Sequence, residues 1–224
     1  LISCVTSCGS CPNCRRQMYS HCADGGWILG HMIDGTQAEY VRIPHADNSL
    51  YPVPEGADEQ ALVMLSDILP TGFEIGVLAG KVKPGDSVVI VGAGPVGMAA
   101  LLIMVDGDSN RLEVATRFGA THVIDIKTEN AVERIFELTG GVGVDVAIEA
   151  VGIPASFDTC QSVIAPGGNI ANVGVHGKSV ELHLEKLWIQ NINISTGLVN
   201  TNTTPMLMKT VQSGKVDAGK LITH

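Results

Sequence analysis

The stretch SVVIVGAGPVG at residues 87–97 decides the fold of this chain of 224 residues. Its β-branched run at 88–91 predicts a buried strand. Gly92, Gly94 and Gly97 then follow in the Gly-x-Gly-x-x-Gly spacing, with Pro95 and Val96 inside it. In this context the first glycine permits a tight turn, the second lets the backbone approach a pyrophosphate, and the third lets a helix pack closely on the strand. Backbone N–H groups at the start of that helix can hold the anion. The stretch therefore predicts a dinucleotide site.

The same rhythm of strand, turn and helix continues along the chain. Short β-branched apolar runs recur at residues 103–106, 122–126, 144–149, 169–173 and 193–197. Helical patterns at 110–118 and 129–139 end at glycines. This alternation predicts an α/β fold with a doubly wound parallel sheet over residues 81–224. The glycines and proline at 92–97 argue against a membrane span in the long apolar stretch 88–105.

Residues 1–80 have a different pattern. Short strands are expected at 38–44 and 49–54, and Asp58 is expected to cap a helix that runs toward Pro70. No alternation of strands and helices is present in this part. We therefore expect a separate, mostly β domain over residues 1–80.

The composition excludes several classes of protein. Hydrophobic residues make up 45% and charged residues 17%, enough apolar surface for a core and too much for global disorder. The net charge of −9 argues against binding of a phosphate backbone. The first residues show no signal-peptide pattern, and the clustered cysteines do not resemble a secreted disulfide framework. We expect a cytoplasmic protein.

Four clustered cysteines give the strongest metal signal. Cys8, Cys11, Cys14 and Cys22 have the spacing C-x2-C-x2-C-x7-C. Four thiolates can surround zinc tetrahedrally and leave no open position, so the expected site is structural. The alternatives are four reduced cysteines in a loop, or a zinc ribbon that contacts nucleic acid, which the acidic charge disfavours.

An acidic residue after the second strand of such a fold usually binds the ribose of the cofactor. Asp106 has this position and favours NAD, because a carboxylate repels a 2′-phosphate. Asp108 is the alternative, and Arg111 is a further candidate contact. Only eight residues separate Gly97 from Asp106, where about 20 are usual. Either the first crossover helix is truncated, or a segment is missing between Leu102 and Ile103. We expect the latter, with a Cα separation at that point well beyond the usual 3.8 Å.

Four segments together resemble the zinc-dependent medium-chain alcohol dehydrogenases: residues 8–22, 35–41 (GTQAEYV), 67–72 (DILPTG) and 92–97. The resemblance implies a GroES-like catalytic domain and a Rossmann domain that binds NAD. It also implies that this chain is a fragment that lacks the N-terminal part of the catalytic domain.

Several site residues follow from the resemblance alone. Asp67 falls where the family has the third protein ligand of a catalytic zinc, often a cysteine. The other two ligands, a Cys and a His, would lie outside this chain. A helix cap before Pro70 is the alternative role for Asp67. Thr71 would lie beside the nicotinamide. The remaining implied cofactor contacts are three valines at or near strand ends: Val151, Val173 and Val175. For Val151 and Val173 the alternative role is core packing. The histidines His21, His31 and His45 lack the family's ligand context and are expected to lie at the surface or to pack.

The resemblance implies a zinc-dependent oxidoreductase that transfers a hydride between an alcohol, or its aldehyde or ketone, and NAD. A small-molecule substrate and a homodimer or homotetramer are expected. Polyol, threonine or formaldehyde dehydrogenases remain alternatives, as does a non-catalytic NAD-binding structural protein on the same fold.

Overall fold

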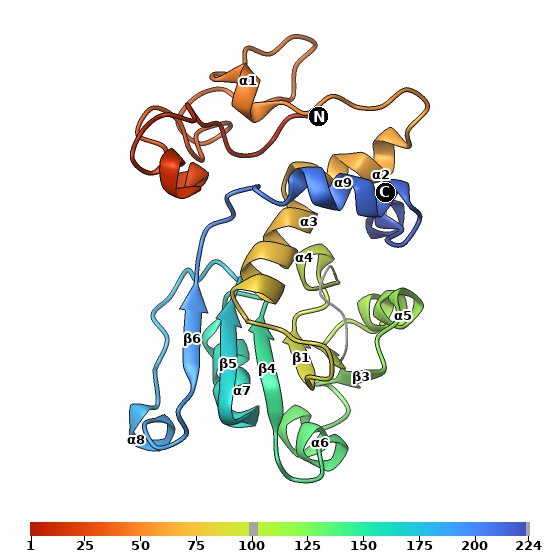
Figure 1. Cartoon of the computed structure of the whole chain (residues 1–224). Coiled ribbons are helices and arrows are strands. Elements are labelled where there is room, and N and C mark those ends of the chain that lie inside the picture. The colour runs from red at the N-terminus through yellow and green to blue at the C-terminus, as the bar shows by residue number, and fades with distance from the viewer. Residues whose placement is uncertain (99–102, 223–224) are drawn as a thin grey trace. The chain divides into compact units, whose positions relative to one another are not determined.

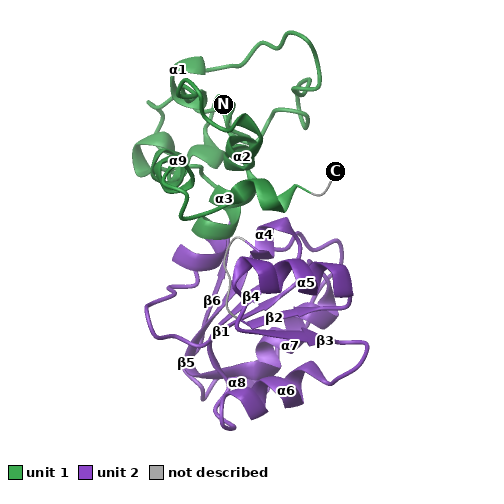
Figure 2. Cartoon of the chain, turned by 90° about the vertical axis from the view of Figure 1, so that its right-hand side faces the viewer, with its two compact units in different colours: residues 1–74, 198–224 green, residues 75–197 purple. Residues whose placement is uncertain are grey.

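The computed structural model describes residues 1–98 and 103–222, which form two compact units (Figure 2). One unit contains Leu1–Glu74 together with Leu198–His224, and the other contains Ile75–Gly197. The pattern of the sequence instead predicts that every residue after 80 belongs to the second domain. The reason for the difference is a set of hydrogen bonds between distant residues. The Glu74 carboxylate accepts from the backbone N–H groups of Asn200, Thr201 and Thr203, at 2.8, 3.1 and 2.9 Å.

The second unit is built on one parallel sheet, in which β6, β5, β4 and β1 lie side by side in Figure 1, and the full strand order is β3-β2-β1-β4-β5-β6. This is the order of a doubly wound dinucleotide-binding sheet, so the predicted fold class is confirmed. The strands lie close to the predicted runs, except that β5 starts earlier: β1 Val88–Val91, β2 Ile103–Asp106, β3 His122–Asp125, β4 Val144–Glu149, β5 Ile164–Asn172 and β6 Asn193–Thr196.

The described helices of this unit connect the strands: α4 Pro95–Met98, α5 Ser109–Phe118, α6 Ala131–Leu138, α7 Pro154–Val163 and α8 Leu184–Leu187. Asp108 caps α5, because its Oδ1 accepts from the N–H groups of Asn110 and Arg111. Gly119 ends the helix in the left-handed conformation. Asp108 therefore has a structural role, which leaves Asp106 as the ribose candidate.

The core of this unit lies along the sheet. Every residue of β1 is buried, and the strand pairs with β2 on one side and β4 on the other. Ile135 and Phe157 from the flanking helices pack in the same apolar cluster. The expected break between Leu102 and Ile103 lies outside the described residues.

The first unit consists mainly of short helices and loops. Its elements are η1 Cys14–Arg16, η2 Tyr19–His21, α1 Ala46–Ser49, α2 Glu59–Val63, η3 Met64–Ser66, α3 Ile68–Thr71, α9 Thr204–Gln212 and η5 Ala218–Leu221, with a π-helix, Gly72–Leu78, that continues from α3 across the boundary into the second unit. Asp58 caps α2 as expected, with Oδ1 3.1 Å from the Ala61 N–H.

The strands expected at residues 38–44 and 49–54 are absent from the structure. The described residues of this unit contain only isolated bridges, such as that between Ile2 and Leu50. Pro44, Pro52 and Pro54 cannot donate ladder hydrogen bonds, and Tyr40 is 92% exposed; residues 38–44 therefore lack a buried face, and neither segment has a partner strand beyond an isolated bridge.

No single described helix is long and apolar enough to cross a membrane. Two consecutive helical segments, Glu59–Ser66 and Ile68–Leu78, are together long and apolar enough by length and composition, but the chain bends by 50° between them.

Candidate functional site

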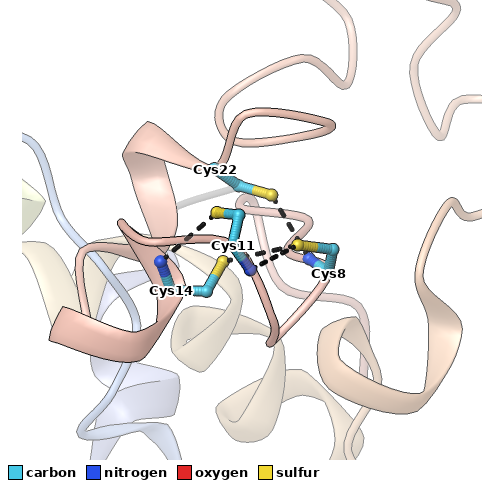
Figure 3. A group of neighbouring side chains, drawn as sticks. All are labelled: Cys8, Cys11, Cys14 and Cys22. Atoms are coloured by element: carbon cyan, nitrogen blue, oxygen red, sulfur yellow. Dashed lines mark hydrogen bonds between the residues drawn. The ribbon is translucent and has the colours of Figure 1, made fainter.

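The four clustered cysteines form a compact group of sulfur atoms in the first unit. Their Sγ atoms all lie within 4.8 Å of one another, and the side chains converge from one loop (Figure 3). The Sγ atoms of Cys8 and Cys14 are 3.9 Å apart. Tetrahedral coordination with Zn–S bonds of about 2.3 Å places sulfur atoms about 3.8 Å apart, so the spacing fits zinc.

Backbone N–H groups surround this cluster. The N–H groups of Cys8 and Cys11 donate to the sulfurs of Cys22 and Cys8, at 3.3 and 3.4 Å. Hydrogen bonds from Ser10 and then from Cys11 lower the pKa of the Cys8 thiol to about 5, whereas burial raises the pKa of Cys14 to about 12. A bound cation deprotonates coordinating thiols, which removes this contrast between them. Four sulfur ligands leave no place for substrate, so the group fits a structural metal.

The glycine turn after β1 has the three properties that the sequence predicts. Gly92 has φ +113°, and a Cβ there would lie 2.9 Å from the Ala150 carbonyl oxygen. A Cβ on Gly97 would lie 2.0 Å from the Gly92 carbonyl oxygen, so only glycine lets the helix approach this closely. A Cβ on Gly94 would meet nothing within 4 Å. The open space beside Gly94 is where a pyrophosphate can approach the backbone.

A cavity of about 330 Å³ opens beside this turn within the second unit. Asp106, Arg111 and Val151 line it together with Gly92 and Gly94. The structure thus brings together five of the predicted cofactor residues from β1, β2, β4 and the connections that follow them. Pro95, Val96 and Gly97 lie on α4, directly after the turn.

Asp106 ends β2 and faces the glycine turn. Its Oδ2 accepts from the Ala93 N–H at 2.7 Å, and its Oδ1 accepts from the Asp108 N–H at 2.8 Å. The Arg111 guanidinium lies 3.9 Å from the same carboxylate. Each carboxylate oxygen can accept a further bond, so Asp106 can still receive the hydroxyl groups of a ribose.

The other two valines lie after β5. Val173 follows this strand and donates its N–H to the Glu149 carbonyl at 2.8 Å, whereas Val175 is 92% exposed. Val175 therefore has no core-packing role. Its place after the carboxyl end of a parallel strand is where such sheets bind ligands.

Asp67 and Thr71 are neighbours in the first unit. The Thr71 hydroxyl donates to Asp67 Oδ1 at 2.6 Å. Asp67 separates η3 from α3 and makes no side-chain cap hydrogen bond, so of the alternative roles it breaks the helix before Pro70 but does not cap it. With Cys4 and Trp27 it lines a cavity of about 720 Å³. Burial, with the Asp67 carboxylate adding to it, raises the pKa of the Cys4 thiol to about 12.

The three histidines that the structure describes in the first unit pair with groups other than Asp67. His21 contacts the Ser20 hydroxyl, His31 stacks on Trp27, and His45 contacts Asp24. Among the described residues, the cysteine cluster is the only group of three or more potential metal ligands. Asp67 thus does not complete a catalytic zinc site with residues that the structure describes.

Glu149 and His176 form a contact that the pattern of the sequence does not predict. Glu149 is fully buried, and His176 Nε2 lies 3.3 Å from its Oε2. The signal in the sequence was a charged residue at the end of an apolar run.

The structure thus combines four cysteines that could hold a metal ion with a parallel sheet in the strand order typical of dinucleotide-binding folds, and comparisons with known proteins place this combination in a family. A family model described as zinc-binding dehydrogenase matches residues 87–213, and one described as alcohol dehydrogenase GroES-like domain matches residues 1–55. The chain belongs to the zinc-binding dehydrogenases of the medium-chain alcohol dehydrogenase type.

Individual relatives support the assignment. An alcohol dehydrogenase from Cupriavidus necator is 36% identical over 216 residues, which cover 90% of this chain and 59% of the relative. The solved zinc-dependent alcohol dehydrogenase 2 of "Streptococcus pneumonia", in its apo form, is 58% identical with a TM-score of 0.94, and the match covers 100% of this chain and 67% of that one. The chain thus spans about 59% of the length of its first curated relatives.

A further relative bears on the short crossover after β1. A probable zinc-binding alcohol dehydrogenase from Mycobacterium tuberculosis is 30% identical over 236 residues, which cover 100% of this chain of 224 residues and 60% of the relative. The relative therefore contains residues within the matched span that have no counterpart here. That a missing segment belongs between Leu102 and Ile103 remains our prediction.

Proposed function

We propose that the intact protein is an alcohol oxidoreductase that transfers a hydride between a small alcohol, or the matching aldehyde or ketone, and NAD. The family assignment supports the reaction class. NAD, when bound, accepts or supplies the hydride at its nicotinamide ring. The chain's own part is to bind the dinucleotide on the glycine turn and to orient it along the carboxyl ends of the strands.

The position of Asp106 is the observation that carries the choice of NAD. Its carboxylate lines the cavity at the end of β2 and retains free acceptor capacity toward a ribose diol. A 2′-phosphate would meet this negative charge in the same place. Arg111 is the one residue among these cavity contacts that favours the phosphate, and it lies within 3.9 Å of Asp106. The choice between NAD and NADP has to be argued from these residues, because one relative is an NADP-dependent isopropanol dehydrogenase from Entamoeba histolytica.

The cavity beside Asp67 supports a small substrate. Its lining combines apolar side chains, among them Trp27, Leu62 and Val63, with the carboxylate of Asp67. We propose that Asp67 is a carboxylate ligand of a catalytic zinc in the intact protein, since carboxylate oxygen is an ordinary zinc ligand. Among the described residues only Asp67 is proposed as a ligand of that zinc, and the remaining ligands would come from residues outside this chain.

A binding experiment tests the choice of cofactor. NADH and NADPH are titrated into the wild-type protein, Asp106→Ala and Asp108→Ala. We expect wild type to prefer NADH and Asp106→Ala to lose most of that preference. Asp108→Ala is the matched control, because it removes a carboxylate that caps α5 and should leave the preference unchanged. Failure of the wild-type protein to bind either nucleotide would contradict the proposed function.

A further inference from the structure

A carboxylate with no exposure to solvent ends the fourth strand of the sheet. Glu149 is 0% exposed, and its Oε1 accepts three hydrogen bonds. Two come from the backbone N–H groups of Val151 and Gly152, at 3.0 and 2.8 Å, and the third comes from the Ser156 hydroxyl. A buried carboxylate is costly unless donors surround it. Glu149 therefore fixes the backbone of the loop that follows β4.

The second oxygen of this carboxylate faces the loop after β5. Glu149 Oε2 accepts no hydrogen bond from described groups but lies 3.3 Å from His176 Nε2. The same nitrogen lies 2.8 Å from Asn172 Oδ1. The Asn172 amide nitrogen donates to the Gly174 carbonyl oxygen, so its Oδ1 is the acceptor and His176 Nε2 carries the proton. His176 thus directs one N–H toward two acceptors.

The two loops after β4 and β5 are packed closely against each other around Glu149. The Glu149 carbonyl oxygen accepts from the N–H groups of Val173 and Gly174, at 2.8 and 3.1 Å. A Cβ on Gly174 would lie 2.3 Å from Glu149 Oε2, and a Cβ on Gly152 would lie 2.4 Å from the Val175 carbonyl oxygen. A change at Glu149 is therefore transmitted to residues 150–153 and 173–176 together.

The topology places these loops at one end of the dinucleotide site. Asp106 ends β2 on one side of β1, and the loops follow β4 and β5 on its other side. A dinucleotide spans such a sheet across the point where the strand order reverses, which here lies between β1 and β4. With the adenosine ribose at Asp106, the nicotinamide half extends over the ends of β4 and β5. Val151 and Ser156 already line the cavity from this side.

We propose that Glu149 and His176 are positioning residues for the nicotinamide half of the cofactor. They hold the loops after β4 and β5 in the shape that receives this half, and they leave the adenosine half to the glycine turn and Asp106. This inference rests on the proposed function, because it requires that the chain bind NAD.

The test compares two ligands that share the adenosine half. NADH and ADP-ribose are titrated by calorimetry into wild type, Glu149→Gln and His176→Phe. Glu149→Gln keeps the shape and an acceptor at Oε1 but presents an N–H₂ group to the N–H of His176. His176→Phe keeps a ring beside Phe157 and removes the donor. We expect each variant to lose about fivefold in affinity for NADH and little for ADP-ribose, because each loses or reverses the contact of 3.3 Å between Glu149 Oε2 and His176 Nε2. The double variant should lose less than the product of the two single losses, because the residues act as a pair.

Asp145→Asn is the matched control. It exchanges a carboxylate for an amide on the same strand, at the amino end, where Asp145 contacts Ser87. The ratio of the two affinities should equal that of wild type. If the ratio of NADH affinity to ADP-ribose affinity in Glu149→Gln and His176→Phe equals that of wild type, whether or not both affinities fall, the positioning role is overturned and the proposed function is left intact. If wild type binds neither ligand, both proposals fail.

Discussion

Two glycines of the turn after β1 allow affinity and stability to be separated. An alanine Cβ at Gly94 meets nothing within 4 Å, whereas one at Gly97 lies 2.0 Å from the Gly92 carbonyl oxygen. Gly94→Ala should therefore leave the fold intact and obstruct the pyrophosphate. Gly97→Ala should instead force α4 away from the turn.

The magnitudes follow from these distances. At Gly97 the methyl group and a backbone oxygen must separate by more than about 1 Å, and overpacking of this kind costs about 1–3 kcal/mol, occasionally more. We expect about 3 kcal/mol, because the atom in conflict belongs to the backbone. At Gly94 the effect on stability should stay within about 1 kcal/mol, since the conformation is open to alanine and the unfolded chain loses freedom. Affinity for NADH should fall about tenfold or more, which corresponds to about 1.4 kcal/mol.

Urea denaturation and calorimetric titration measure the two quantities on the same samples. The expected pattern is a normal midpoint with weak NADH binding for Gly94→Ala, and a clearly lowered midpoint for Gly97→Ala. The reasoning is refuted if Gly94→Ala binds NADH as tightly as wild type, or if the two variants lose equal stability.

Three further predictions concern other parts of the chain. Cys11→Ser should lose one equivalent of zinc and unfold more readily, because a structural thiolate site contributes folding free energy; metal analysis should show full zinc content in the control Cys160→Ala, whose buried thiol lies outside the cluster. Hydrogen bonds from Ser87 lower the pKa of Asp145, so its stabilisation is present above the unfolded pKa and lost as pH falls through the lower folded pKa. Wild type should therefore lose more stability than Asp145→Asn between about pH 5 and 3 in urea titrations, and parallel curves would contradict this account. Gly174→Ala should weaken NADH more than ADP-ribose, as Glu149→Gln does, since its Cβ would displace Glu149 Oε2; equal weakening of both ligands would count against the shared mechanism.

The sheet could be predicted because its signals are local. Each strand is a short β-branched run bounded by turn residues, and the alternation with helices predicts parallel strands joined by right-handed crossovers, with which the observed order β3-β2-β1-β4-β5-β6 agrees. The cysteine cluster and the glycine turn could be predicted for the same reason, since their spacing along the chain sets their geometry.

Contacts between distant residues could not be predicted in this way. The segment from Leu198 onward belongs to the first unit because its backbone N–H groups donate hydrogen bonds to the Glu74 carboxylate. The residues around Glu74 and around Leu198 contain no sequence pattern that predicts this contact. The strands expected at 38–44 and 49–54 failed because β propensity requires a partner strand, which this segment lacks. The sequence allowed two roles for Asp67, and the structure shows that it stands at a helix break without a side-chain cap hydrogen bond and accepts instead from the Thr71 hydroxyl.

The burial of Glu149 can be explained from its hydrogen-bond partners but not from the sequence of its strand. Asp145 and Glu149 lie on the same face of β4, yet Asp145 is exposed and Glu149 is not. The alternation of a strand cannot distinguish them, because the difference arises from where the flanking loops close. At the carboxyl end those loops supply the donors without which the carboxylate could not be buried. The same hydrogen bonds that make burial of the Glu149 carboxylate possible therefore fix the loops beside the dinucleotide cavity. The burial of Glu149 and its proposed positioning role thus have one physical cause.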